Sequence, residues 1–466
     1  MVADEAVDKE FGTGIIKVTP AHDITDFEIS KRHDLPLVKI IDENGRMNQN
    51  AGIRYAGLKV AEAREKITKD LEELGLLEKT EDYEHNMGRC DRCNSVIEPL
   101  PSDQWFLKVS ELAELAKEAI LKKEVNFHPD RWTDISMRWL ESMRDWNISR
   151  QLWWGHRLPV WQHEPKCVPR KGREKDVDKC IDIIVSPEKP ECKYCDAKYV
   201  QSEDVLDTWF SSALWPFAAL GWPEETKDLK EYYPIQFITS DRGIVFLWQI
   251  RMIFSGKYFT GKAPFSNIYI HPTVLTKDGK RMSKSLGTGI DPVNLIEKYG
   301  TDALRFGLAY QNTGIQDMKF GEDTILMGKK FANKLWNIAR YILDRVPESW
   351  EKYESLSIGE ISGSESFGGP MRTTAEKVTG HINQYRFGEA AHIIYDYMWH
   401  EIADKYIEMS KDKNQPNEEE IKQNLVLYLI NLLKLLHPFM PFVTEEIWSK
   451  LLLKNKKLLI VEEWPV

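Results

Sequence analysis

The sequence predicts an α/β multidomain protein that ends in a helix bundle. Residues 204–275 alternate short apolar runs of strand type with runs of helix type, as in a doubly wound sheet. From residue 291 onward, apolar residues recur at helical spacing. Residues 1–80 mix both patterns, which favours a separate α+β unit. The 466 residues leave room for about three domains, each with its own core.

The composition excludes several classes of protein. Hydrophobic residues make up 42% and charged residues 29% of the chain, as in ordinary globular proteins. A net charge of −10 argues against a general nucleic-acid coat but allows a local basic face. No apolar run approaches the about 18 residues that a membrane-spanning helix needs. The acidic first residues lack the apolar stretch of a signal peptide. We therefore expect a cytoplasmic protein.

The first 200 residues contain several distinct segments. Strand-like runs at 14–18 and 37–41 precede a helix-like run at 60–74. Residues 108–150 have mostly helical periodicity. Residues 163–202 are polar, rich in Lys and Pro, and carry cysteines, which predicts an insertion or a small metal-bound ribbon.

The C-terminal part has one helical run after another. A Ser-, Glu- and Gly-rich break at 346–370 predicts a loop within it. The helical runs cover residues 295–299, 303–309, 325–343, 375–382, 390–407 and 425–436.

The most informative string is K-R-M-S-K-S-L-G at residues 280–287, just after a strand-like run at 268–275. It combines three cations and two hydroxyls with Gly287. Lys and Arg neutralise phosphate oxygens, hydroxyls and backbone amides add donors, and Gly lets the backbone come close. The string predicts a site for a polyanion, and a solvated basic loop is the alternative.

A second polar string lies near the N-terminus, G-T-G-I-I-K-V-T-P-A-H-D-I-T-D at residues 12–26. Lys17, Thr19, Asp23 and Asp26 bring a cation, a hydroxyl and two carboxylates together within ten residues. Acids three apart lie on one face of a helical turn, where the helix dipole favours them. An ordinary N-capped helix after a strand is the alternative.

Four of the six cysteines form two pairs with the spacing C-x2-C, which indicates metal binding in a reducing compartment. The pair Cys90 and Cys93 has zinc-knuckle spacing, but within 20 residues only His85 is available to join it.

The second pair, Cys192 and Cys195, has more potential partners. Cys167 and either His163 or Cys180 would complete a tetrahedral, structural Zn²⁺ site. Reduced, metal-free thiols are the alternative for both pairs.

Taken in order, these strings resemble class I aminoacyl-tRNA synthetases. Residues 280–287 resemble the K-M-S-K-S signature, with Arg281 in place of its first Lys. Residues 204–212, D-V-L-D-T-W-F-S-S, resemble the valine-specific branch more than the isoleucine branch, which usually reads V-W-F-D-S. Residues 12–26 follow the pattern of the valine-specific editing domain.

Further strings support the resemblance along almost the whole chain. They are W-N-I-S-R-Q-L-W-W-G-H-R-L-P at 146–159, Y-G-T-D-A-L-R-F at 299–306, N-K-L-W-N at 333–337 and H-P-F-M-P-F-V-T-E-E-I-W at 437–448. The last of them resembles the end of the family's anticodon-binding bundle.

The resemblance implies an ATP-dependent ligase that joins valine to its tRNA through valyl-adenylate. Lys284 and Arg281, with Ser283 and Ser285, would stabilise the triphosphate charge during attack on the α-phosphate, and Mg²⁺ would bind the pyrophosphate. The further ATP contacts that it implies are Lys280, Met282, Asp241 and His271. At Asp241 the chain departs from the family's T-G-x-D-I-I strand end.

The resemblance also implies two sites that select the amino acid. Asp207, Trp209 and Trp248 would lie at the valine pocket. In editing, Asp26 would anchor the ammonium group of a misattached amino acid, and Lys17, Thr19 and Asp23 would recognise the threonine hydroxyl and position the ester. An apolar pocket rejects threonine only about 10²-fold, the figure known for valine enzymes in general, so a hydrolytic second site is needed.

The implied fold is the second half of a Rossmann-like class I catalytic domain, a partial α+β editing domain and a C-terminal α-helical anticodon-binding bundle. The implied segments are the C-terminal part of the editing domain (1–88), a connective region with a Cys pair (89–145), the catalytic half (146–290) with a zinc-ribbon-like insertion (163–200), the signature loop and stem-contact region (277–322) and the anticodon-binding domain (323–466).

The sequence does not contain the family's H-I-G-H string or the first part of its editing domain. Because a Rossmann fold binds ATP between two halves, we expect this chain alone to form no valyl-adenylate. Valine, ATP, valine tRNA and a separate N-terminal half are the expected partners. The alternatives are a non-catalytic tRNA-binding module and a fragment of an isoleucyl-type synthetase.

Overall fold

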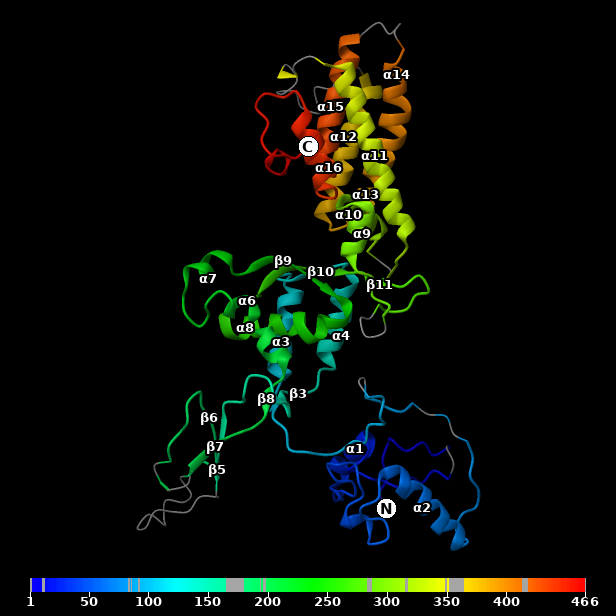
Figure 1. The fold of residues 1–466 in the computed structure, drawn as a ribbon. Helices are drawn as coiled ribbons and strands as arrows, with labels where there is room; N and C mark the ends of the chain where they lie inside the picture. Colours follow the sequence, from blue (N-terminus) through cyan, green and yellow to red (C-terminus); the bar gives the residue numbers. More distant parts are fainter. Residues whose placement is uncertain are drawn as a thin grey trace. The chain divides into compact units, whose positions relative to one another are not determined.

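The computed structural model describes residues 2–10, 13–82, 84, 86–90, 93–164, 180–192, 194–195, 198–282, 287–314, 317–347, 350–351, 364–412 and 418–465. The chain forms two compact units, Met1–Trp105 and Phe106–Val466 (Figure 1).

The described residues of the first unit form the helices α1 (Ile24–His33) and α2 (Val60–Glu73) and the 3₁₀ turn η1 (Gln49–Ala51). The helix expected at 60–74 is confirmed. The strands expected at 14–18 and 37–41 are wrong, because the described residues of this unit form only isolated bridges, such as Ile41 with Met47. Ile15 stays 73% exposed, so no neighbouring strand buries the apolar side chains that suggested a ladder.

The second unit is built on a parallel three-stranded sheet in the order β2 (Asn126–His128), β10 (Phe265–His271) and β9 (Ile235–Asp241). The chain passes from β9 to β10 through η3 (Arg242–Ile244), the π-helical turn η4 (Val245–Gln249) and α8 (Ile250–Thr260). This strand–helix–strand crossover confirms the α/β alternation with parallel strands that was predicted for residues 204–275.

Helices cover one face of this sheet. Ile268 and Ile270 of β10 and Phe127 of β2 pack with α3 (Ser110–Leu121), α4 (Arg131–Glu141) and α8 in one apolar core. The helices predicted within 108–150 are therefore confirmed. The short helices α5 (Thr208–Ala213), α6 (Trp215–Ala218) and α7 (Lys227–Tyr232) precede β9.

Aromatic side chains cover part of the sheet through Tyr385, in the turn between α12 (Ser364–Asn383) and α13 (Phe387–Asp396). The Tyr385 ring lies 4.3 Å from that of His128 in β2, and it stacks at 5.2 Å on Phe237 of β9. The hydroxyl of Tyr269 in β10 accepts a hydrogen bond from Asn312 Nδ2 at 2.7 Å. The α12–α13 turn therefore docks on the sheet.

Most of the shorter strands, which lie outside this sheet, pair antiparallel, and the last pair described below is parallel. β1 (Phe106–Leu107) pairs with β3 (Trp146–Asn147), and β4 (Ser149–Arg150) pairs with β8 (Val205–Leu206). A three-stranded ribbon has the order β6 (Ile183–Val185), β5 (Val160–Glu164) and β7 (Lys198–Gln201). After β10, β11 (Val274–Leu275) pairs with β12 (Met318–Lys319).

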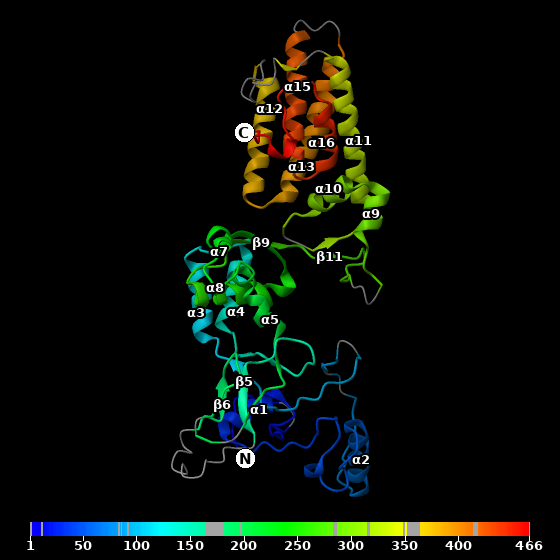
Figure 2. The same cartoon turned by 60° about the vertical axis from the view of Figure 1, so that its left-hand side comes forward.

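The C-terminal part is a helix bundle, which Figure 2 shows from a second side. Its core is the largest apolar cluster of the described residues and includes Phe331, Leu335, Ile394 and Leu432. Its remaining elements are α9 (Pro292–Tyr299), α10 (Thr301–Gln311), α11 (Glu322–Arg345), the π-helix η7 (Tyr397–Ile407), α14 (Glu408–Ser410), α15 (Glu418–Leu436), α16 (Pro441–Lys450) and η8 (Leu459–Val461).

The helical runs predicted for the bundle are confirmed, with one correction at the break. The loop predicted at 346–370 is too long, because α12 already begins at Ser364. Glycine and serine favour a loop locally, but the apolar residues that follow pack into the bundle core and extend the helix. Among the described helices, none combines the length and the apolar character needed to cross a membrane.

Candidate functional site

Asp241 and His271 are cross-strand partners at the carboxyl ends of β9 and β10. The Asp241 carboxylate accepts hydrogen bonds from the Gly243 amide at 2.7 Å and the Thr273 hydroxyl at 2.9 Å. Burial opposes ionisation of Asp241, but these two bonds, with His271 and Arg281 nearby, outweigh it and lower the pKa. The carboxyl edge of a parallel sheet is where α/β folds bind ligands.

A tight turn brings the beginning of the signature loop back to this edge. The Thr276 amide donates to the Lys280 carbonyl at 2.8 Å, and the Lys280 amide donates to the Thr276 hydroxyl at 2.9 Å. Arg281 then forms an isolated antiparallel β-bridge with Leu275. Its guanidinium lies close to Gly243, because a Cβ atom added to that glycine would be 3.9 Å from Arg281 Nη2. The structure therefore brings Arg281, Asp241 and His271 together, while the Lys280 ammonium points to Asp278 at 3.4 Å.

Met282, which the resemblance placed at the ATP site, has an apolar environment. Its side chain packs against the cluster of Leu295, Ala303 and Phe320. This contact anchors the loop to α9 and α10. Ser283, Lys284 and Ser285 lie outside the described residues.

A pocket of about 470 Å³ opens at the same edge. Arg131, Arg242, His271 and Asp317 line it together with Trp132. Arg242 Nη2 lies 2.7 Å from Asp317, whose carboxylate also accepts from the Thr273 amide at 3.3 Å. Sequence reasoning missed Arg242, although it directly follows Asp241, and it missed Arg131, which has no local signal.

Asp207 lies at the centre of a buried polar network and caps α5 through the Trp209 amide at 3.3 Å. The indole Nε1 of Trp146 donates to its carboxylate at 2.9 Å. Arg150 and Arg251 form ion pairs with the same carboxylate at 3.1 and 3.5 Å. Asp207 therefore joins β3, β4, α5 and α8, and sequence reasoning missed both arginines.

The two tryptophans predicted beside Asp207 lie on connected elements. Trp209 of α5 is partly buried against the core of the sheet. Trp248 of η4 donates from Nε1 to the Ser212 carbonyl at 3.1 Å, which ties η4 to α5. Both indoles are thus held at α5, the helix that Asp207 caps.

In the first unit, Thr19, Asp23 and Asp26 come together at the start of α1. Asp26 is buried and accepts from the Thr19 amide at 2.6 Å and the Thr19 hydroxyl at 3.0 Å. Asp23 is the N-cap, and its carboxylate accepts from the Asp26 amide at 3.0 Å. Lys17 is exposed. The two alternatives considered for this string are therefore both realised, because the polar cluster forms the N-terminal cap of α1.

His22, in the same string, was missed as a contact residue. Its Nε2 accepts from the Ile40 amide at 3.0 Å, so Nδ1 carries the proton and donates to the Pro99 carbonyl at 3.1 Å. The imidazole joins segments that lie 18 and 77 residues away.

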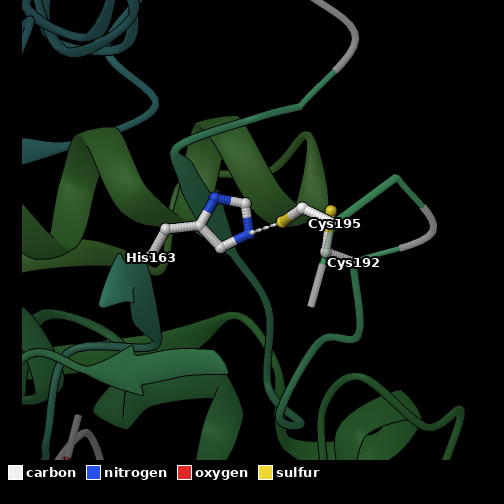
Figure 3. Close-up of side chains that lie close together, drawn as sticks. All are labelled: His163, Cys192 and Cys195. Carbon is white, nitrogen blue, oxygen red and sulfur yellow. Dashed lines mark hydrogen bonds between the residues drawn. The ribbon is translucent and has the colours of Figure 1, made fainter. Parts of the chain in front are cut away.

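The clearest candidate metal centre lies on the ribbon, where His163, Cys192 and Cys195 converge (Figure 3). Their ligand atoms all lie within 4.8 Å of one another, and Cys195 Sγ is 3.8 Å from His163 Nε2. Cys180 Sγ lies 3.7 Å from Cys192 Sγ. The sequence predicted either His163 or Cys180 as a further ligand of this pair. In the structure both side chains lie near the pair, His163 at Cys195 and Cys180 at Cys192.

The chemistry of these donors, an imidazole and thiolates, suits Zn²⁺. The close group is His163, Cys192 and Cys195, and Cys180 lies next to Cys192 but outside that group. With Zn–S bonds of about 2.3 Å, tetrahedral thiolates lie about 3.8 Å apart, close to the separation of Cys180 and Cys192. Burial opposes ionisation of Cys192, but hydrogen bonds, including one from the Tyr194 amide, lower its pKa to about 7. Thiolates are the form that binds zinc. Cys167 lies outside the described residues.

Cys90 and Cys93 lie in a knuckle-like turn, in which the Asn94 amide donates to the Cys90 carbonyl at 2.9 Å. A hydrogen bond with Ser95 lowers the pKa of Cys93 to about 7. Within the described ranges, the ribbon cluster is the one group of three or more close metal-binding side chains. His85 is outside those ranges, so a metal at this pair stays a prediction.

Comparison with known proteins decides the family. The family described as "tRNA synthetases class I (I, L, M and V)" matches residues 19–321, well over half of the chain. The chain is a class I tRNA synthetase family member. The family described as "Anticodon-binding domain of tRNA ligase" matches residues 371–466, within the helix bundle.

Among curated members of the class I family, the chain is similar to valine--tRNA ligases. It is 46% identical over its whole length to the one from Thermotoga maritima and 45% identical to the one from Petrotoga mobilis. It covers 52% of each of these relatives, so the chain spans about half their length.

Solved structures of the class I family share the fold. The Mycobacterium tuberculosis methionyl-tRNA synthetase in complex with methionyl-adenylate has a TM-score of 0.58 at 17% identity, covering 79% of this chain and 67% of that one. The ternary complex of Agrobacterium radiobacter LeuRS with tRNA and LeuAMS has a TM-score of 0.52 at 19% identity, covering 69% of this chain and 43% of that one. The predicted fold class is thereby confirmed.

Proposed function

We propose that this chain forms part of a valine–tRNA ligase, an enzyme that activates valine with ATP and transfers it to its tRNA. The supporting observation is the 46% identity to a curated valine--tRNA ligase over the whole chain. The valine-type string at 204–212 points the same way. Such a ligase acts where translation occurs, so we place it in the cytoplasm.

ATP would bind at the carboxyl edge of β9 and β10. Arg281, with Lys280 and Lys284 from the same loop, supplies positive charge for the triphosphate, and Ser283 and Ser285 supply hydroxyl donors. His271 lines the pocket at this edge. The Asp241 carboxylate already accepts two hydrogen bonds from within the chain. Its remaining lone pairs are available to accept one from a ribose hydroxyl. Mg²⁺, when bound with ATP, neutralises part of the phosphate charge.

The Asp207 network would act on valine indirectly. Asp207 is buried and saturated with donors, so it holds α5 in place while Trp209 and Trp248 shape an apolar pocket. An indole wall favours a branched aliphatic side chain through burial of apolar surface.

The start of α1 would take part in hydrolysis of misattached threonine. The buried carboxylate of Asp26 could bind an ammonium group. Asp23 is the N-cap of α1, where the helix dipole favours its negative charge. Lys17 is exposed and free to approach an ester. Thr19 fixes the orientation of Asp26 through two hydrogen bonds.

The ribbon would hold a structural Zn²⁺ through His163, Cys180, Cys192 and Cys195. We expect about one zinc per chain by elemental analysis. Cys195→Ser should remove most of it, whereas Cys93→Ser, at the knuckle-like turn, should leave it in place. Equal zinc content in both variants would contradict the assignment.

The domain arrangement follows the same proposal. Residues 1–88 belong to the editing domain, 89–145 are connective, 146–290 with the insertion at 163–200 complete the catalytic domain, 277–322 carry the signature loop and 323–466 bind the anticodon arm of valine tRNA. An N-terminal half that carries the first nucleotide-binding strands would complete the ATP site.

A chimera tests the function. This sequence replaces the matching half of the Thermotoga maritima ligase, and valine-dependent ATP–pyrophosphate exchange and tRNA charging are measured. We expect charging with valine and a loss of about 10²-fold or more in Arg281→Gln, the usual effect of removing one charge-stabilising donor.

Two other results would count against the proposal. A folded chimera that charges isoleucine rather than valine would assign the sequence to the isoleucine branch. A folded chimera that binds valine tRNA with a steep salt dependence but activates no amino acid would support the tRNA-binding module instead.

A further inference from the structure

One carboxylate, that of Asp317, holds the residues that follow two neighbouring strands of the sheet. Asp317 lies between α10 and β12. Its Oδ1 accepts a hydrogen bond from the Thr273 amide at 3.3 Å, and its Oδ2 lies 2.7 Å from Arg242 Nη2. Arg242 directly follows β9, and Thr273 follows β10 by two residues. Asp317 therefore ties the ends of both strands to the segment before β12.

The first of these two contacts reaches Asp241. The Thr273 hydroxyl donates to Asp241 Oδ2 at 2.9 Å, while the Thr273 amide donates to Asp317. The Thr273 carbonyl accepts from the Met318 amide at 2.9 Å, so its backbone is held on both sides by residues 317 and 318. Asp317 thus helps to fix the hydroxyl that orients the Asp241 carboxylate.

The second contact controls a cation beside Asp241. Arg242 is the next residue in the chain, and its side chain is 54% exposed and paired with Asp317. The hydrogen bonds of Asp241 come instead from the Gly243 amide and the Thr273 hydroxyl, which are uncharged donors. An arginine binds a carboxylate strongly, and Asp241 is within reach of so long a side chain. A pair of Arg242 with Asp241 would occupy the lone pairs that a ribose hydroxyl needs.

The surrounding charges make this pairing depend on Asp317. Arg131, Arg242 and His271 line the pocket at this edge, and Asp317 is the acidic side chain among its described lining residues. Without that carboxylate, Arg242 would lose its partner in a basic surrounding. Attraction between opposite charges would then favour its movement to Asp241.

We propose that Asp317 is a positioning residue of the ATP site, which holds Arg242 away from Asp241 and so keeps the Asp241 carboxylate free to accept a ribose hydroxyl. The ribose contact rests on the proposed function. The choice of Arg242 between two carboxylates is a property of this chain and can be measured without any ligase activity.

Four forms of the full chain test the choice of partner: the unaltered chain, Asp317→Asn, Arg242→Gln and the double variant. Asp317→Asn removes the charge but keeps a carbonyl oxygen for the Thr273 amide. The pKa of Asp241 is followed by NMR with ¹³C-labelled aspartate carboxyl groups. Loss of the Asp317 charge by itself lowers this pKa whichever residue stands at position 242, because a like charge is removed. Arg242 turning to Asp241 would lower it further, so we expect a larger fall with Arg242 than with Gln at that position.

The chimera with the Thermotoga maritima half tests the consequence for ATP. We expect Asp317→Asn to raise the KM for ATP about ten-fold, the effect of losing one hydrogen bond to a charged group, with little change in kcat or in the KM for valine. Adding Arg242→Gln should restore the KM for ATP. A merely structural role of Asp317 would change all three constants, and a second substitution would not restore them. Glu376→Gln removes the carboxylate of an exposed arginine pair on α12 and should leave every value unchanged.

Two results would overturn the proposal. One is an equal fall in the pKa of Asp241 with Arg or Gln at position 242. The other is an active chimera in which Arg242→Gln fails to rescue Asp317→Asn. If the unaltered chimera is inactive, the proposed function fails, and the titration of the full chain still decides the partner of Arg242. If Asp317→Asn does not fold by circular dichroism, Asp317→Ser replaces it in both measurements.

Discussion

Asp207 shows how one side chain serves a site without facing a ligand. Its carboxylate caps α5, accepts from an indole and pairs with two arginines. Removing a buried charge partner is far more costly than removing an exposed one, because the remaining charges stay buried. Met282 is a contrasting case. It lies within the string predicted to bind phosphate, but its side chain packs into an apolar cluster.

Gln249 is an unsatisfied polar residue in the core. It is fully buried, and neither its side-chain oxygen nor its nitrogen has a hydrogen-bond partner within the described residues. We predict that Gln249→Leu stabilises the sheet by about 1 kcal/mol, because it removes an unmet desolvation cost. Slower hydrogen exchange of the β10 amides measures this.

The exposed change Gln236→Leu is the control for this prediction, with an expected effect within about 0.5 kcal/mol. Faster exchange of β10 in Gln249→Leu would show that Gln249 has a polar partner, such as an ordered water, that stabilises the fold.

His437 should make the bundle sensitive to acid. Burial lowers its pKa below the usual 6.5, although Glu445 and Asp302 oppose this, and its Nδ1 lies 2.8 Å from the Thr444 hydroxyl. In the unfolded chain the imidazole binds a proton first as the pH falls, so stability is full above about pH 6.5 and declines below it.

We therefore predict that the melting temperature of the bundle falls between pH 7.5 and pH 5.5, and that His437→Gln reduces this fall. Calorimetry at the two pH values measures it. An equal fall in His437→Gln would assign the acid sensitivity to other groups.

At the scale of elements, α16 is fixed at both ends by side chains from elsewhere in the chain. At its start, the buried carboxylate of Asp302 accepts from the amides of Phe442 and Val443 at 3.1 and 2.6 Å. Arg305 donates to the carbonyls of Pro438 and Phe439. These contacts join the strings at 299–306 and 437–448, which the sequence showed only as separate resemblances.

At the end of α16, the Lys456 ammonium donates to the carbonyls of Trp448, Ser449 and Leu451 at 3.0, 2.6 and 2.7 Å. A cation there satisfies the free carbonyls of the last turn and the helix dipole. We predict that Lys456→Met destabilises α16 by about 1–3 kcal/mol, measured as faster hydrogen exchange of its amides.

Lys454→Met is the matched control, because Lys454 is exposed and pairs with Glu351 on the surface. It should change stability by less than about 1 kcal/mol. Equal effects of the two variants would mean that Lys456 does not cap the helix.

Elements with strong periodicity were predicted correctly, and elements that depend on partners were not. The helix at 60–74 and the bundle helices carry their own apolar stripe, so local sequence is sufficient. The runs at 14–18 and 37–41 have strand-forming residues, but a strand also needs a neighbour to pair with. The start of α12 at Ser364 was missed because packing extends that helix into a loop-like composition.

At the scale of the large unit, Tyr385 links the sheet to the bundle. Its ring meets His128, Phe237 and Tyr269, and its φ of 58° places it in the left-handed region that most residues avoid. Next to it, a Cβ at Gly388 would lie 2.0 Å from the Asn312 carbonyl oxygen, so only glycine allows α13 to approach α10 this closely.

We predict that Tyr385→Ala loosens this joint by about 1–3 kcal/mol, since several aromatic pairs are lost together. Hydrogen exchange should become faster at the α12–α13 turn and at β9, while α15 in the bundle core stays protected. Tyr385→Phe keeps the ring and should exchange as the unaltered chain does. Unchanged exchange in Tyr385→Ala would show that the sheet and the bundle are held together elsewhere.

The sequence by itself determined the family resemblance, the fold class, the bundle helices and the residue types of each site, because these depend on composition, spacing and periodicity. The tertiary structure decided which residues meet. It paired Asp241 with His271 across two strands and placed Arg150 and Arg251 on Asp207. It also set His163 beside Cys192 and Cys195, and Cys180 beside Cys192. Each of these contacts joins residues far apart in the chain, and only strand register and helix packing bring such residues together.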